Sequence, residues 1–384
     1  MSPRLPSVDL VRAFALLGIC VVNLPQMGME YGDSLAAPVG GVDQAARLFV
    51  ATFLEAKSFP VFAFLLGWGL GGQWERGRFE GFAPRHLRRC AALAVLGLLH
   101  GALVYTGDIL LPYAILSLLA WPLLAATPRT LLRVALAMLA LGVLFLLLLG
   151  FTLRFFAGFA DDPMLLSRLG GTFAEATRQR MEDLPTDFFS AMLFNGPIAL
   201  GALLAGVAAA KSRFLEAPDL LARTRALLPL PLVLVLGIGF AANLIYGTTM
   251  AFAGAESPAA FPAFGAVGVG SPILAALWLV LLLRLASRWD APGWLMAAGR
   301  NSLSAYVFQG VAAGWVFGSY GLGLFGHLGF AGLLALALGV WLASCLVAAA
   351  CERLLGAGPL EHLLRAVTGR RPPARPQPPP LPVG

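Results

Sequence analysis

The sequence predicts an all-α protein, a polytopic transmembrane helical bundle of about ten spans with both termini in the cytoplasm. Composition is the first reason: 59% of the 384 residues are hydrophobic, only 12% are charged, and the mean hydropathy is +0.80. The second is that apolar runs of about 20 residues, long enough to cross a hydrocarbon core as a helix, recur from end to end. The third is that Lys and Arg concentrate in alternate loops, as topology requires of a membrane bundle.

Charged and Pro- or Gly-rich breaks divide the chain into ten apolar segments. Only Gly107 and Asp108 separate the third from the fourth, so we expect these two to form a tight helical hairpin. Residues 1–352 are predicted to form a single transmembrane bundle with a partly ordered outer loop at 152–188, and residues 353–384 a cytoplasmic, basic and Pro-rich tail that is disordered at its end. The ten segments are residues 9–28, 46–73, 87–106, 108–126, 130–151, 189–210, 227–247, 268–286, 296–317 and 329–350.

Loop charges set the predicted orientation. Loops after the even-numbered segments are rich in Lys and Arg, whereas loops 248–267 and 318–328 have none and loop 152–188 has four arginines against six acidic residues. Because cytoplasmic loops retain positive charge during insertion, the basic set is expected in the cytoplasm. The net charge of +7 is therefore attributed to topology, and no nucleic-acid partner is expected.

Cofactor and metal motifs are not expected. The four cysteines lie in or beside the spans without metal-ligand spacing, so neither a metal site nor a structural disulfide is predicted. The glycines at 321, 323 and 326 match G-x-G-x-x-G, but they lie in a loop between two spans and lack the βαβ context of a dinucleotide site.

Two polar residues of the first span share one helix face. Arg12 and Asn23 are 11 residues apart, which is about three turns and about 16 Å of rise. Arg12 is thus expected near the cytoplasmic side and Asn23 beyond the midplane. The alternative is structural: a pair between Asp9 and Arg12 at the interface, and an asparagine bonded to a neighbouring helix.

The third span places an imidazole inside the predicted bundle. His100 lies about two thirds of the way across, and Asp108 follows in the hairpin turn. A histidine there can act as a general base near neutral pH, and a nearby carboxylate would orient it. The alternative is a histidine that bonds a backbone carbonyl.

The ninth span carries an unusual density of polar residues in its inner half, among them Arg300, Asn301, Tyr306 and Gln309. They predict a lined cavity or a helix entrance, with packing by interhelical hydrogen bonds as the alternative. Arg12, Arg300 and Asn301 would give the inner mouth a cationic lining, and guanidinium groups bind phosphate oxygens in bidentate geometry.

The second span raises two structural expectations. Glu55 and Lys57 are expected to reach the outer interface, where long charged side chains snorkel into water. Gly67 and Gly71 form a small-xxx-small pair, which predicts close helix packing.

Four stretches of the chain together resemble the YeiB family of bacterial membrane proteins, a family of unknown function. They read RLPSVDLVRAFALLGICVVN at 4–23, KSFPVFAFLLGWGL at 57–70, RRCAALAVLGLLHGALVYTGDILLPYA at 88–114 and GRNSLSAYVFQG at 299–310. That family is distantly similar to transmembrane acyltransferases of the heparan-α-glucosaminide N-acetyltransferase type and to those that decorate bacterial surface polysaccharides. The resemblance implies a bacterial cytoplasmic (inner) membrane, a cytosolic acyl-CoA donor and a periplasmic or extracellular acceptor.

The acyltransferases carry an arginine, ten residues, and then a histidine or asparagine, and Arg12 and Asn23 fit the asparagine form. The N-acetyltransferases also use a histidine shortly after that asparagine, whereas residues 24–56 contain none. His100 would therefore have to supply the base from another helix.

Three functions remain open from the sequence. In an acyltransferase, Arg12, Arg300 and Asn301 would bind donor phosphates, and His100, Asp108 and Asn23 would be catalytic, with acyl-CoA as a substrate and no permanently bound cofactor. The second is a proton-coupled transporter or flippase of a polar or anionic solute. The third is a non-catalytic scaffold whose polar residues only join helices, so enzymatic activity itself is left open.

Overall fold

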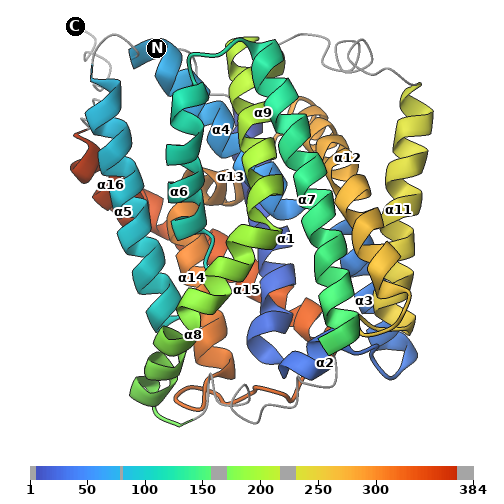
Figure 1. Ribbon diagram of the computed structural model, residues 1–384. Coiled ribbons are helices and arrows are strands. Elements are labelled where there is room, and N and C mark those ends of the chain that lie inside the picture. Colours follow the sequence, from blue (N-terminus) through green and yellow to red (C-terminus); the bar gives the residue numbers. More distant parts are fainter. Residues whose placement is uncertain (1–5, 78–80, 157–170, 217–230, 370–384) are drawn as a thin grey trace, which may run out of the picture.

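The computed structural model describes residues 6–77, 81–156, 171–216 and 231–369, and within these ranges it holds helices and no strand. The long helices run side by side along one axis, α8 crosses them obliquely, and α16 lies on the flank beside α5 (Figure 1). The helices are α1 (Pro6–Gly28), α2 (Tyr31–Leu35), α3 (Gly41–Phe53), α4 (Ser58–Gly77), α5 (Phe82–Leu103), α6 (Leu110–Ala120), η1 (Trp121–Leu123), α7 (Pro128–Phe156), α8 (Phe173–Phe194), α9 (Gly196–Lys211), η4 (Phe214–Glu216), α11 (Leu232–Phe252), α12 (Ala260–Ala286), α13 (Gly293–Arg300), α14 (Ser302–Phe317), α15 (Phe330–Leu355) and α16 (Pro359–Thr368).

Six helical segments of the described chain are long and apolar enough to cross a membrane, or seven if the bent pair α8 and α9 counts as one. They indicate a membrane protein of six to seven membrane-capable helices, so the expected count of ten spans is not supported. Each of the ten apolar segments does contain helix, but α5 is not among the helices that qualify, and α6 and α14 are too short. The six are α1, α3 with α4, α7, α11, α12 and α15.

Breaks inside the bundle explain why α6, α14 and the pair α8 and α9 do not each form one long helix. The chain between α5 and α6 folds back before α6 begins at Leu110, and α13 stops at Arg300 before α14 starts at Ser302. The pair α8 and α9 bends by 56° around Asn195. Hydropathy registers apolar length only, so it does not reveal where a helix begins within the membrane.

The break between α3 and α4 holds buried charge, and the expectation that Lys57 snorkels outward is wrong. Only 2% of the Lys57 surface is exposed, and its Nζ donates a 2.8 Å hydrogen bond to the Ala51 carbonyl oxygen at the end of α3. Arg47 Nη1 lies 2.6 Å from Glu55 Oε2, and the Tyr246 hydroxyl donates to Glu55 Oε1 at 2.7 Å. These side chains turn inward because the interrupted helix leaves backbone carbonyls there, and its neighbours supply opposite charge.

Helices α4 and α9 pack closely, which confirms the packing role expected for Gly67 and Gly71. A Cβ on Gly67 would lie 1.9 Å from the Leu203 carbonyl oxygen, and one on Gly71 would lie 2.9 Å from the Ala210 Cβ. Gly206 on α9 is equally constrained, because its Cβ would meet the Phe64 carbonyl oxygen at 2.0 Å. The two backbones therefore touch directly, as small residues permit in membranes.

The C-terminal region begins as ordered helix. α15 continues to Leu355, and α16 follows at Pro359–Thr368 against α5 and α14, so this part of the predicted tail packs on the bundle. The disorder predicted for the Pro-rich end concerns residues 370–384, which lie outside the described residues, as do residues 157–170 of the predicted outer loop.

Replacing Gly67 with alanine should destabilise the fold by about 1–3 kcal/mol, because the new methyl group forces α4 and α9 apart. Gly69→Ala on the same helix is the matched control, since no atom lies within 4 Å of its added Cβ. Alanine there should be neutral or stabilising. Thermal unfolding of the detergent-solubilised protein measures both changes, and equal melting temperatures for the two variants would contradict the packing account.

Candidate functional site

A buried hydrogen-bonded group joins the end of α5, the turn before α6, and α14. His100 Nδ1 lies 3.0 Å from Asp108 Oδ1, and the Tyr306 hydroxyl donates to the same oxygen at 3.3 Å. Asp108 Oδ2 accepts hydrogen bonds from the backbone N–H groups of Leu110 and Leu111, at 2.8 and 3.0 Å. The carboxylate thus caps the N-terminus of α6, which explains why that helix starts deep in the bundle.

The surrounding donors fix the tautomer of His100. Two backbone N–H groups and a tyrosine hydroxyl all donate to Asp108, so the carboxylate acts as an acceptor throughout. Nδ1 of His100 must then carry the hydrogen that Asp108 accepts, and in a neutral ring Nε2 is left with a lone pair. This is the arrangement that a general base requires.

His100 Nε2 is buried and has no hydrogen-bond partner among the described residues. It lines a cavity of about 10 Å³, close to the volume that one water molecule needs, together with Asn23, Tyr105, Tyr306 and Gln309. Asn23 itself makes no hydrogen bond to a described residue. The structure therefore brings all three predicted catalytic residues, His100, Asp108 and Asn23, into one site.

Gln309 of α14 lines the same cavity as His100. Helix α14 begins at Ser302, after the break at Asn301. Helix α14 also comes very close to the imidazole, since a Cβ on Gly310 would lie 2.4 Å from His100 Nε2. The polar residues of α14 consequently line the cavity.

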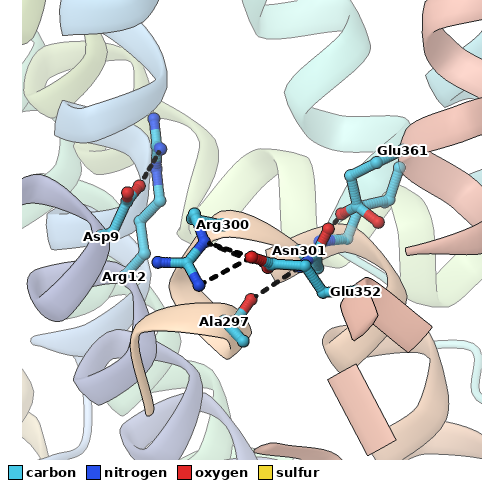
Figure 2. Close-up of polar contacts among 8 residues, drawn as sticks. Asp9, Arg12, Ala297, Arg300, Asn301, Glu352 and Glu361 are labelled. Atoms are coloured by element: carbon cyan, nitrogen blue, oxygen red, sulfur yellow. Dashed lines mark hydrogen bonds and ion pairs between the residues drawn. The ribbon is translucent and has the colours of Figure 1, made fainter. Parts of the chain in front are cut away.

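The predicted cytoplasmic residues form a second polar group (Figure 2). Arg12 Nη1 lies 3.3 Å from Asp9 Oδ1 on α1. Arg300 Nη2 lies 2.7 Å from Glu352 Oε1, and Arg300 Nε also donates to both oxygens of that carboxylate. The two pairs are neighbours, because a Cβ on Gly299 would lie 1.8 Å from the Asp9 carbonyl oxygen.

Asn301 ties three helices together at this end of α14. Its Nδ2 donates to Glu352 Oε2 at 2.7 Å and to the Ala297 carbonyl oxygen at 2.9 Å, and its Oδ1 accepts from the Gly358 N–H at 2.7 Å. The three predicted phosphate-binding residues therefore lie at one end of α1 and α14. Helices α1 and α14 both run from this polar group to the His100 cavity. Along α1, the helical rise from Arg12 to Asn23 is about 16 Å.

Sequence reasoning missed the acidic partners of this group. Neither Glu352 nor Glu361 belongs to a predicted span or to a predicted site. In the structure, Glu361 of α16 accepts hydrogen bonds from the backbone N–H groups of Leu303 and Ser304, at 2.8 and 3.2 Å. A signal existed for Glu352, because an ionisable residue at the end of an apolar run usually has a partner. Its partner Arg300 is 52 positions away, which a single sequence does not reveal.

Metal ligation is not a feature of the described residues, where no group of three or more His, Cys, Asp or Glu side chains could hold an ion. The polar atoms around His100 are one imidazole, one carboxylate already bonded to four groups, and amide and hydroxyl groups. Their chemistry suits proton transfer and hydrogen bonding to a substrate.

Comparison with known proteins finds relatives that match almost the whole chain. It is 26% identical to "Uncharacterized protein YxaH" of Bacillus subtilis (strain 168), over 96% of this chain and 94% of the relative. It is 28% identical to "Uncharacterized protein YeiB" of Escherichia coli (strain K12), over 95% of this chain and 96% of the relative. The resemblance to the YeiB family is thus confirmed.

Within this YeiB-like chain, residues 209–371 match the family model described as "Protein of unknown function (DUF418)". That part holds Arg300, Asn301, Gln309, Glu352 and Glu361, whereas His100 lies in the part before it. No solved structure matches the chain.

Removing either member of the Arg300–Glu352 pair should destabilise the YeiB-like bundle, because the remaining charge is left partly buried and unpaired. We expect Arg300→Ala and Glu352→Ala each to cost about 2–3 kcal/mol, and the double variant to cost less than their sum. Thermal unfolding of all four proteins gives the coupling. Strict additivity of the two losses would show that the pair does not join α13 to α15.

Proposed function

We propose that the protein is a transmembrane acyltransferase that moves an acyl group from a cytosolic acyl-CoA to an acceptor on the outer side of the membrane. One observation carries the proposal: a buried histidine is oriented by a carboxylate and directs Nε2 into a small cavity that Asn23 also lines, and neither Nε2 nor Asn23 has a hydrogen-bond partner in the described part of the chain. A base and an amide donor are the two groups that acyl transfer requires of the protein.

The step would proceed as follows. His100 Nε2 accepts the proton of the acceptor's hydroxyl or amine as that atom attacks the thioester carbonyl carbon. Asn23 donates a hydrogen bond to the carbonyl oxygen, on which negative charge develops. The carbon–sulfur bond then breaks, the thiolate leaves, and the proton held by His100 returns to sulfur as free CoA forms.

The donor phosphates would bind at the polar group that contains Arg12, Arg300 and Asn301. The side chains of Arg12 and Arg300 are 27% and 29% exposed, so both reach the surface while they pair with Asp9 and Glu352. Arg300 uses Nε and Nη2 for Glu352, which leaves Nη1 for an anion. Asn301 would hold the break before α14 in place.

We further propose a bacterial cytoplasmic-membrane location with both termini in the cytoplasm. Basic residues after α4, at the start of α7, after α9 and after α12 support that orientation through the positive-inside rule. In this arrangement α5, α6 and α14 complete a ten-segment bundle within the membrane, and the His100 cavity faces the outer half.

A second candidate function is proton-coupled transport of a polar or anionic solute. The observation in its favour is the interrupted helix α3–α4, since broken helices with buried charge form ion and substrate sites in transporters. Solute uptake by proteoliposomes under a pH gradient, without consumption of acyl-CoA, would favour transport over acyl transfer.

His100→Ala should lower acyl-CoA turnover by about 100-fold or more, because general-base catalysis contributes rate factors of that order. Asp108→Asn should also lower turnover, since an amide oxygen orients the ring more weakly than a carboxylate and the capped α6 N-terminus loses its anion. Release of free CoA thiol by the purified protein measures both.

His327→Ala is the matched control, because this histidine lies exposed in the segment between α14 and α15. Its turnover should equal that of the wild type. Undiminished turnover in a folded His100→Ala protein would remove His100 from the mechanism.

A further inference from the structure

A second buried acceptor, the side-chain carbonyl oxygen of Gln309, lies in the His100 cavity. Gln309 is 4% exposed, and its Oε1 has no hydrogen-bond partner among the described residues. The same holds for His100 Nε2, which lines the same cavity. A buried polar atom without a partner costs free energy, and in native proteins ordered water or a ligand usually satisfies such atoms. The proposed transfer step uses Nε2 and gives Oε1 no role.

Hydrogen bonds on the other side of the Gln309 amide fix its orientation. The Ser344 hydroxyl donates its single hydrogen to the Trp341 carbonyl oxygen at 2.7 Å. Ser344 Oγ can then only accept, and it accepts from Gln309 Nε2 at 3.0 Å. The NH₂ group therefore faces Ser344, and the atom that remains for the cavity is the acceptor Oε1.

The cavity matches one water molecule in size and in hydrogen bonding. Its volume of about 10 Å³ is close to the space that one water needs. Water carries two hydrogens, so one molecule can donate to His100 Nε2 and to Gln309 Oε1 at once. Asn23 lines the same cavity, and one N–H of its amide can donate to the water oxygen. Three hydrogen bonds are typical of a buried water molecule.

We propose that the cavity binds this water molecule and that the protein uses it to hydrolyse acyl-CoA, as a second activity besides transfer. The inference rests on the proposed binding of acyl-CoA. Gln309 Oε1 accepts one hydrogen and positions the water oxygen, which attacks the thioester carbon while His100 Nε2 takes the other hydrogen as a proton. The carbon–sulfur bond breaks, and the thiolate takes that proton from His100. The products are a carboxylic acid and free CoA.

Transfer and hydrolysis share one position for the attacking atom. The outer acceptor must bring its hydroxyl or amine within reach of His100 Nε2, which is where the water is held. A bound acceptor therefore excludes the water, and water attacks when no acceptor is bound. Gln309 Oε1 serves the water and has no part in the transfer step, so a change at Gln309 separates the two activities.

The test follows the acyl group in permeable membrane vesicles from cells that overproduce the full-length protein. The vesicles receive acetyl-CoA with ¹⁴C in the acetyl group, and vesicles without the protein give the background. Free acetate measures hydrolysis, and label bound to membrane components measures transfer. The wild type should form acetate above background. Gln309→Met, which keeps the length but lacks the acceptor, should lower acetate formation by about tenfold or more, because the water loses its position, and should retain the bound label.

Three further variants separate this role from general damage. Gln309→Glu keeps an acceptor oxygen and should retain most of the acetate formation. Gln73→Met makes the same change on α4, where Gln73 bonds the Gly69 carbonyl oxygen, and should leave acetate formation unchanged. Ser344→Ala removes the partner that orients the Gln309 amide and should lower acetate formation even if Gln309→Met does not fold.

The two labelled products distinguish failure of this inference from failure of the proposed function. Bound label above background, with acetate at background, would overturn hydrolysis and leave acyl transfer intact. Acetate that depends on Gln309, without bound label, would support hydrolysis and overturn transfer. Equal acetate formation by the wild type and a folded Gln309→Met protein would show that Gln309 does not position the water, and would overturn the inference. Label in neither product would overturn both.

Discussion

The hydrogen bond between His100 and Asp108 is the interaction on which the organisation of the bundle centre depends. A carboxylate in an apolar interior must have its acceptor capacity filled, and Asp108 achieves this with one imidazole N–H, one tyrosine hydroxyl and two backbone N–H groups. Those donors belong to α5, α6 and α14. Satisfying one carboxylate therefore sets the position of the α5–α6 turn, starts α6 in mid-bundle, and holds α14 against His100.

The same requirement shapes the other two polar groups. Glu352 joins the break between α13 and α14 to α15, and Glu55 joins α3 to Tyr246 of α11. In each case a helix is interrupted and the freed backbone or side-chain groups find a charged partner. Interrupted helices are tolerated at membrane depth when the protein itself satisfies the exposed polar groups. Among the described residues of these three polar groups, buried acceptors without a partner occur in the His100 group, where they line a cavity.

Much of this could be predicted from the sequence. Apolar runs located the helical segments, the spacing of Arg12 and Asn23 identified one stripe of α1, and the short distance from His100 to Asp108 suggested their proximity. The number of membrane-capable helices could not be predicted from the sequence, because hydropathy does not record that α6 begins at Leu110 inside the bundle. The burial of Lys57 was also hidden, since its acceptor is a backbone carbonyl exposed only by the break after α3. The Arg300–Glu352 pair depends on packing between helices distant in sequence.

The position of the hydrogen on the His100 ring tests the proposed role of the His100–Asp108 hydrogen bond most directly. Solid-state ¹⁵N NMR of the histidine-labelled protein in lipid bilayers distinguishes the two ring nitrogens, and the four histidines of the chain permit assignment by comparison with His100→Gln. The account predicts a hydrogen on Nδ1 and a bare Nε2 in the resting protein, with the pattern lost in Asp108→Asn. A hydrogen on Nε2 and a bare Nδ1 in the wild type would contradict it.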